Sequence, residues 1–375
     1  MTRTPYTLPL ESRVSEGPQR YQFHTADGVC SKDAFRTSEL QLLESLWEAD
    51  VGDLLCPEAN YGVVGTILSA KGESVQMTES SARATHICEK NIRENDADAE
   101  VSLLADLTTV EREFDTVAYA PKPYTALPVG KQRIADSLAV LRTGGSLYVA
   151  ASKQSGLTRY RDCLQELGAT VEQVSKSGDS RLLKATRPKK YNPTSYVSPE
   201  VIQATIDGIE PRLVTVPGLF SAAEVDRGTR LLMESVAIED GEQVLDVCCG
   251  YGAIGAYAAH VAECDVWLSD DNKIATTCAE CTLEKSDVDG TVVTADCVEG
   301  VSHQTFDRVL CNPPTHAGEG VLSELFAGIH GVLDDNGVLC IVHHAELDLS
   351  DHLSRFSSVE RGCTGEEHVV LEVTP

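Results

Sequence analysis

The stretch VLDVCCGYGAIG (residues 244–255) decides the fold, because the chain contains a second copy of it. Moving back by 190 positions gives LLCPEANYGVVG (54–65), which shares a Tyr-Gly-x-[Val/Ile]-Gly core in register. Two further pairs match in the same order at an offset of 192: FDRVLCNPP (306–314) with FDTVAYAPK (114–122), and VLDDNGVL (332–339) with VLRTGGSL (140–147). Three ordered matches at a nearly constant offset indicate a duplicated domain.

Each copy alternates short apolar runs with segments of helical period, which is typical of βα units on a parallel sheet. In the second copy we predict helices at 253–261 and 273–285, and strands at 243–247, 265–269, 291–294, 308–311, 338–343 and 369–373. The sequence therefore predicts an α/β protein of two tandem Rossmann-like domains, 1–186 and 217–375, joined by a proline-rich linker at 187–216. SAAE (221–224) has the spacing of a capping box for the first helix of the second domain.

The 375 residues include 58 acidic and 31 basic side chains, a net charge of −27, and 42% of the residues are hydrophobic. That apolar content excludes a disordered acidic chain. Excess surface carboxylate suits a protein in high salt, so we expect a halophilic origin. Residues 1–190 carry a net charge of −3 and residues 191–375 carry −24. A polyanionic partner would therefore approach the first half more readily.

Thirteen cysteines without regular spacing favour reduced thiols in the cytoplasm over a disulfide framework. Cys278 and Cys281 have a metal-like spacing, but neither a second pair nor a histidine cluster accompanies them. We therefore expect no metal site. Since no apolar run approaches the roughly 20 residues of a membrane span, we also expect no membrane partner.

The second copy has the pattern of a nucleotide-type turn between a strand and a helix. Gly250, Gly252 and Gly255 follow a strand that carries Asp246, and they allow the backbone to come close to a ligand. This glycine spacing suits NAD and S-adenosylmethionine equally. A carboxylate at 246, however, would repel a pyrophosphate and pair with the ammonium group of an amino acid, which favours the methyl donor.

Three more polar residues follow predicted strands, and the carboxyl ends of parallel strands are where such sheets bind ligands. Asp270 is placed to accept hydrogen bonds from ribose hydroxyls, and Asp296 to accept one from the amino group of adenine. Asn312 precedes Pro313 and Pro314, which fix φ and hold the carboxamide in one direction. Nicotinamide chemistry does not require such an amide, so the set favours a methyl donor.

The chain from about residue 217 to 373 resembles the methyltransferase small domain of class I S-adenosylmethionine-dependent enzymes. More specifically, it resembles small-subunit rRNA guanine-N2 methyltransferases of the RsmC type, in which a degenerate first copy precedes a catalytic second one. The motifs that carry this resemblance are VPGLFS (216–221), DRGTRLL (226–232), DVCCGYG (246–252) and NPPTH (312–316). Cys248 departs from the family turn, where a glycine is usual.

The resemblance implies an enzyme that converts S-adenosylmethionine to S-adenosylhomocysteine. Its donor site would use Phe220, Asp246, Gly250, Gly252, Asp270, Asp296 and Asn312. Its acceptor site would use Asn312, Pro313, Pro314, Thr315 and His316. Asn312 and the carbonyl of Pro313 would accept hydrogen bonds from the exocyclic amine of the substrate, and no strong general base is required.

The acceptor loop departs from the family at Thr315, where relatives usually have an aromatic residue that stacks on a flipped base. Either Tyr251 or Phe220 stacks instead, or the substrate is not a flipped guanine. His316 is a proton relay or a loop residue, and we favour the loop role. Alternative methyl acceptors are adenine N6 and a protein glutamine. The alternative to an enzyme is a non-catalytic protein that binds RNA during ribosome assembly.

The first copy has lost two of the polar residues of the site. Ala120 stands at the position of Asn312, and Cys56 at that of Asp246. A degenerate copy with most of the basic residues is interpreted as a platform for RNA or as a folding partner, with a purely structural remnant as the alternative. The expected partner of the protein is rRNA or a ribosomal small-subunit particle. Because the duplication already supplies an intramolecular pseudo-dimer, we expect a monomer.

Overall fold

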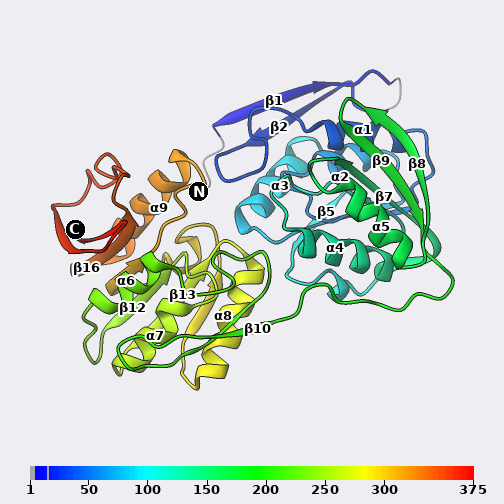
Figure 1. The fold of residues 1–375 in the computed structure, drawn as a ribbon. Coiled ribbons are helices and arrows are strands. Elements are labelled where there is room, and N and C mark those ends of the chain that lie inside the picture. Colours follow the sequence, from blue (N-terminus) through cyan, green and yellow to red (C-terminus); the bar gives the residue numbers. More distant parts are fainter. Residues whose placement is uncertain (1–4, 15–16) are drawn as a thin grey trace. The chain divides into compact units, whose positions relative to one another are not determined.

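The computed structural model describes residues 5–14 and 17–375. The chain forms two compact units, one ending at Ser198 and one spanning Pro199–Pro375. In Figure 1 the first unit runs from blue to green, and the second from light green to red. Both units contain a seven-stranded sheet of the same topology, which confirms the predicted duplication.

The first unit has the sheet order β5-β4-β3-β6-β7-β9-β8. The five strands from β5 to β7 are parallel, and β9 and β8 close the sheet as an antiparallel hairpin. The strands are β3 (Asp53–Cys56), β4 (Ser74–Glu79), β5 (Glu100–Leu103), β6 (Phe114–Tyr119), β7 (Leu141–Ser152), β8 (Thr170–Ser177) and β9 (Ser180–Thr186). The helices are α1 (Thr37–Leu46), α2 (Val63–Leu68), α3 (Ala82–Glu94), η1 (Leu107–Thr109), α4 (Leu127–Val140) and α5 (Leu157–Glu166). A separate hairpin, β1 (Tyr6–Glu11) and β2 (Arg20–Thr25), precedes them.

The second unit repeats this topology, with the order β14-β13-β12-β15-β16-β18-β17. Its strands are β12 (Gln243–Val247), β13 (Asp265–Asp270), β14 (Thr291–Thr294), β15 (Phe306–Cys311), β16 (Leu333–His344), β17 (Ser358–Thr364) and β18 (His368–Thr374). Its helices are α6 (Arg227–Ser235), α7 (Ala253–Val261), α8 (Lys273–Ser286), η2 (Glu299–Val301) and α9 (Glu319–Val332). All six predicted strands and both predicted helices lie within these elements.

The sheet of the second unit is mixed, whereas the βα pattern predicts a parallel one. β18 pairs antiparallel with β16, and β17 pairs antiparallel with β18. The sequence pattern misses β17 because this edge strand is largely exposed and carries SVERGCT, which has no buried apolar face.

The predicted linker contributes a hairpin to the second unit. β10 (Glu200–Gln203) and β11 (Arg212–Thr215) pair antiparallel, and β11 contacts α8. The backbone N–H of Val214 donates to Oγ1 of Thr282 at 2.8 Å. Side chains of α8 therefore hold the second half of this proline-rich segment, which short-range sequence patterns do not show.

The capping-box prediction at Ser221 is wrong. Ser221 has a φ of +49° and lies in a turn, where Glu224 N–H donates to its carbonyl. α6 begins six residues later, at Arg227, and its N-cap is Asp226, whose Oδ2 accepts from Thr229 N–H at 2.9 Å.

The sheet of the second unit is covered on both faces. α7 contacts α6 and α8; α7 packs on β12 and β13, and α8 packs on β13 and β14. α9 supplies Leu322, Leu325, Phe326 and Ile329 to a core that also contains Leu245, Val309 and Ile341 from the strands. Enclosed on both faces, the sheet leaves only its strand ends for a ligand. None of the helices in the described ranges has the length and apolar character needed to cross a membrane.

Candidate functional site

The predicted donor residues of the second unit meet at one edge of its sheet. β12 lies between β13 and β15, with β14 beyond β13, and these four strands are parallel. Their carboxyl ends are therefore adjacent. Asp270 ends β13, Asp296 follows β14, Asn312 follows β15, and the glycine turn follows β12.

The glycine turn has a left-handed backbone that is open on one side. Gly250 and Gly252 have φ values of +55° and +82°. A Cβ at Gly252 would lie 3.0 Å from side chains of Leu268 and Ala279, so this glycine allows α7 and α8 to approach each other. A Cβ at Gly250 would meet no atom within 4 Å, so the turn leaves space there for a ligand. Cys248 has a φ of +62°, a conformation that glycine adopts at lower cost.

Asp246 is buried with one oxygen satisfied and one not. Its Oδ2 accepts from Gly255 N–H at 2.8 Å, at the start of α7, whereas its buried Oδ1 has no hydrogen-bond partner. Desolvation raises the pKa of this carboxyl to about 7. An unsatisfied buried acceptor costs free energy until a donor reaches it, so Asp246 suits a ligand that brings a cationic N–H group.

Asp270 holds the glycine turn in place. Its two oxygens accept from Gly250 N–H at 2.9 Å and from Asn272 N–H at 2.8 Å. Desolvation raises its pKa to about 6. Ala295 N–H donates to the carbonyl of Asp270 at 3.0 Å, which brings the buried Asp296 to the same rim.

Asn312 is held by two side chains of the second unit. Its Nδ2 donates to Oγ1 of Thr229 at 2.8 Å and to Oδ2 of Asp226 at 3.3 Å. The carbonyl of Pro313 accepts from Thr315 N–H at 2.9 Å, and a carbonyl oxygen has a second acceptor position. The Asn312 oxygen and the Pro313 carbonyl thus form a pair of acceptors after β15. Pro314 and His316 are exposed on the following turn.

Of the two aromatic candidates for base stacking, only Phe220 has its ring exposed. Tyr251 is 5% exposed, and its hydroxyl lies 3.5 Å from the carbonyl of Ser221. Phe220 is 67% exposed, in the turn before α6. Burial removes Tyr251 as a stacking surface and leaves Phe220 available.

The first unit keeps the turn but fills it. Positive φ values occur at the same three positions in both copies, at 58, 60 and 62 (+51°, +57°, +85°) and at 248, 250 and 252 (+62°, +55°, +82°). Asn60 replaces the open glycine, and its side chain exchanges hydrogen bonds with the backbone of Cys30 at 3.1 and 2.8 Å. The space that the second unit leaves open is therefore occupied.

Two cations of the first unit complete this filling. The ammonium of Lys122 lies 2.8 Å from Glu79, the counterpart of Asp270, and 3.5 Å from Glu58. Burial opposes its charge, but the two carboxylates raise the pKa of Lys122 above its usual value. Arg36 Nη1 donates to the carbonyls of Ala120 and Pro121 at 3.0 and 3.2 Å. These residues are the counterparts of Asn312 and Pro313, so in the first unit an internal side chain satisfies the backbone carbonyls at both positions.

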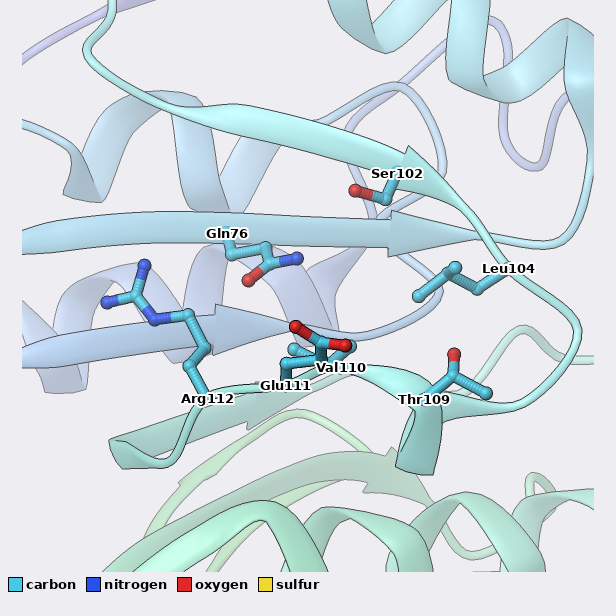
Figure 2. A pocket seen from close by; sticks show the side chains of 7 residues that line it. All are labelled: Gln76, Ser102, Leu104, Thr109, Val110, Glu111 and Arg112. Atoms are coloured by element: carbon cyan, nitrogen blue, oxygen red, sulfur yellow. The ribbon is translucent and has the colours of Figure 1, made fainter.

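The first unit also has a shallow pocket of about 340 Å³ on the face of β4 and β5 (Figure 2). Gln76 points into it from β4, and at the same register position the second unit has Trp267. The ring of Trp267 packs edge-on against Phe306, at a centroid distance of 6.4 Å. The cation of the pocket, Arg112, is already paired with Asp53 at 2.8 Å. The pocket thus arises because Gln76 is smaller than Trp267, the residue at the same position in the second unit.

Sequence reasoning named the strand-end residues but missed Arg36 and Lys122. It placed Asp226 and Thr229 within one motif and gave neither a role. The repeat offset is the signal that finds them. Arg36 and Asp226 are both N-caps of the first helix of their copy, 190 positions apart. A change of residue type between equivalent positions therefore marks where the two copies differ in chemistry.

Comparisons with known proteins agree with this geometry. The methyltransferase small domain matches residues 20–184 and again residues 210–372. A curated relative, ribosomal RNA small subunit methyltransferase C of Pseudoalteromonas atlantica, is 26% identical over 264 residues, covering 67% of this chain and 74% of the relative. Ribosomal RNA large subunit methyltransferase G of Aliivibrio salmonicida is 24% identical over 88% of this chain and 87% of its own length.

The fold is also that of a solved structure, a 16S rRNA N2 methyltransferase of T. thermophilus (RsmC) in complex with AdoMet and guanosine. It superposes with a TM-score of 0.80 and 22% identity over 98% of both chains. Because both halves match one family description and both contain its sheet, this chain belongs to the methyltransferase small domain family.

Proposed function

We propose that the second unit transfers a methyl group from S-adenosylmethionine to N2 of guanine in small-subunit rRNA, leaving S-adenosylhomocysteine. The observation that carries the proposal is the acceptor pair after β15. The oxygen of Asn312 and the carbonyl of Pro313 are both available to N–H groups beside the donor crevice. The relative named as a small-subunit methyltransferase and the T. thermophilus enzyme with guanosine support this acceptor.

The residues of the crevice fit S-adenosylmethionine. The unsatisfied Oδ1 of Asp246 is a partner for the ammonium of the methionine part, and the open side of Gly250 gives the ligand access to the backbone. Asp270 would take the ribose hydroxyls and Asp296 the adenine amino group. When bound, the sulfonium supplies an activated methyl group and a neutral leaving group.

The protein contributes position more than acid–base chemistry. The lone pair of an aromatic amine is delocalised, and two acceptors that hold its N–H bonds turn the lone pair toward the methyl group. No strong base is required. This agrees with His316, whose side chain is exposed and makes no hydrogen bond among the described residues. Phe220, with its exposed ring, would stack on the base in place of the aromatic residue that Thr315 replaces.

The first unit would position the RNA rather than bind a methyl donor. Asn60 and Lys122 occupy its crevice, and the first half carries 23 of the 31 basic residues. Phosphate contacts from such residues fix orientation without reading sequence. We further propose that the protein works as a monomer in the cytoplasm of a salt-adapted cell, where its net charge of −27 is screened.

The test uses purified protein in molar KCl with tritiated S-adenosylmethionine. The acceptors are rRNA and subunit particles from a strain that lacks this protein, and the products are identified by nucleoside mass spectrometry. N2-methylguanosine in small-subunit rRNA is expected. Label in large-subunit rRNA would instead make that RNA the substrate, a second candidate that the large subunit methyltransferase G of Aliivibrio salmonicida supports. Label in adenine or in a protein glutamine would show that guanine N2 is not the acceptor. If the protein did not bind S-adenosylmethionine, the proposal of an enzyme would be overturned in favour of a non-catalytic ribosome-assembly protein.

A further inference from the structure

We propose that Asp226 and Thr229 are positioning residues that lock the carboxamide of Asn312 with its oxygen facing the substrate amine. This inference rests on the proposed function and adds to it a reason why the site accepts an amine. It concerns one contact of three side chains at the start of α6 and the end of β15.

The chemistry of the three side chains fixes the orientation of the amide. The two ends of a carboxamide have nearly the same shape, but one accepts hydrogen bonds and the other donates two. A carboxylate has only acceptor oxygens, so Asp226 can face the Nδ2 of Asn312 but not its oxygen. Thr229 receives the shorter bond, at 2.8 Å, and Asp226 the longer one, at 3.3 Å. With both N–H bonds of Nδ2 engaged, a rotated amide would set its oxygen against the oxygens of Asp226.

The pair is itself held rigidly. Oδ2 of Asp226 also accepts from the backbone N–H of Thr229 at 2.9 Å, which fixes the first turn of α6. Thr229 is buried, and between the two residues a Cβ at Gly228 would lie 2.9 Å from the ring of His368. The turn therefore packs tightly on β18, and its acceptors have little freedom to move.

The duplicated copy provides an internal comparison. Arg36 occupies the N-cap position of α1 as Asp226 does that of α6, and Glu39 corresponds to Thr229. Arg36 donates to the carbonyl of Ala120. Where the carboxamide is absent, a donor thus stands at the position of Asp226, and the acceptor at the position of Thr229, Glu39, is engaged by Arg36 at 2.8 Å. The acceptor at the N-cap therefore accompanies Asn312 rather than the helix start as such, because the N-cap of α1 is a donor.

The locked orientation gives the site a preference for its substrate. An acceptor oxygen at Asn312 attracts N–H groups and repels carbonyl oxygens and unprotonated ring nitrogens. On guanine this selects the exocyclic amine at N2 over the neighbouring acceptor atoms. A free amide that rotates would lose this discrimination.

The test compares Thr229→Val with Thr229→Ser. Valine keeps the shape but removes the acceptor, while the Asp226 cap to the backbone stays, and serine restores a hydroxyl. With S-adenosylmethionine and the rRNA acceptor, Thr229→Val should lower kcat about tenfold, the equivalent of one hydrogen bond. The Kd of the donor and the Tm should stay near those of the unaltered protein, and Thr229→Ser should recover most of kcat. The proposal would be overturned if kcat of Thr229→Val equalled that of the unaltered protein, or if kcat fell equally in Thr229→Val and Thr229→Ser.

A second readout does not depend on activity. In protein labelled with ¹⁵N-asparagine, the side-chain amide signal of Asn312 is assigned by its disappearance in Asn312→Ala. Slow exchange of its protons with solvent, lost in Thr229→Val, would support the locked amide. Fast exchange in the unaltered protein would overturn it. Absence of methyl transfer with slow exchange would refute the proposed function while the lock stands.

Discussion

Asp270 holds the backbone N–H of Gly250 through its carboxylate at 2.9 Å, and the first unit repeats this bond between Glu79 and Asn60. Duplication therefore preserved the bond that shapes the turn in both copies. What differs is the side chain above it, since the second copy has hydrogen at position 250 and the first has a carboxamide at position 60. The same backbone turn thus forms an open crevice in the second unit and a filled one in the first.

Asn312→Ala should abolish methyl transfer, with a loss of at least about 100-fold in kcat, because the amine loses one of its two acceptors. A role of Asn312 in the donor site as well would lower donor affinity in the same variant. Steady-state kinetics and calorimetric titration measure the two effects. His316→Ala is the matched control on the same loop, and it should retain activity because its side chain is exposed. An equal loss in His316→Ala would instead assign the histidine a role as proton relay.

The affinity for S-adenosylmethionine should fall as the pH decreases below about 7. Asp246, with its pKa raised to about 7, must be ionised to pair with the ammonium group, and below that pH binding has to displace a proton. Each further pH unit should therefore cost up to about tenfold in affinity. Calorimetry between pH 8 and pH 6.5, in buffers of different ionisation enthalpy, should show proton release on binding. Asp246→Asn should bind weakly and lose this pH dependence. An unchanged pH profile in that variant would assign the titration to another group.

Phe220→Ala should raise KM for the RNA about tenfold, since base stacking on an aromatic ring contributes roughly 1–3 kcal/mol. The ring is 67% exposed, so the variant should keep its Tm. Tyr251→Phe serves as the comparison, because this ring is buried and should not touch the base. If Tyr251→Phe weakened RNA binding and Phe220→Ala did not, the stacking assignment would be reversed.

The first unit should not bind the methyl donor, so titration should give one site per chain. Lys122→Met should leave Glu79 as an unpaired buried carboxylate and destabilise the first unit by about 3–5 kcal/mol. Calorimetric scans of the full chain would show a lower Tm for one of its transitions. Arg142→Met is the control, because its ion pairs with Asp53 and Asp115 are exposed and should contribute less than about 1 kcal/mol. Similar losses in both variants would contradict a buried network.

The sequence by itself determined the duplication, the strands and helices of the second copy, and the residues at its strand ends. These features follow from local rules. Periods of 2 and 3.6 residues define the elements, and a parallel sheet brings the carboxyl ends of adjacent strands together. Asp246, Asp270, Asp296 and Asn312 could therefore be assigned to one edge without coordinates.

The tertiary structure alone decided which side chains complete or block each crevice. Asn312 reaches Asp226 and Thr229 across 86 and 83 residues, and Lys122 reaches Glu79 across 43. It also buried Tyr251, exposed Phe220 and attached β11 to α8. Such contacts depend on how helices pack against a sheet, which involves many weak interactions between distant segments. Local sequence patterns do not encode them, so the amide at position 312 could be read from the sequence, but its orientation could not.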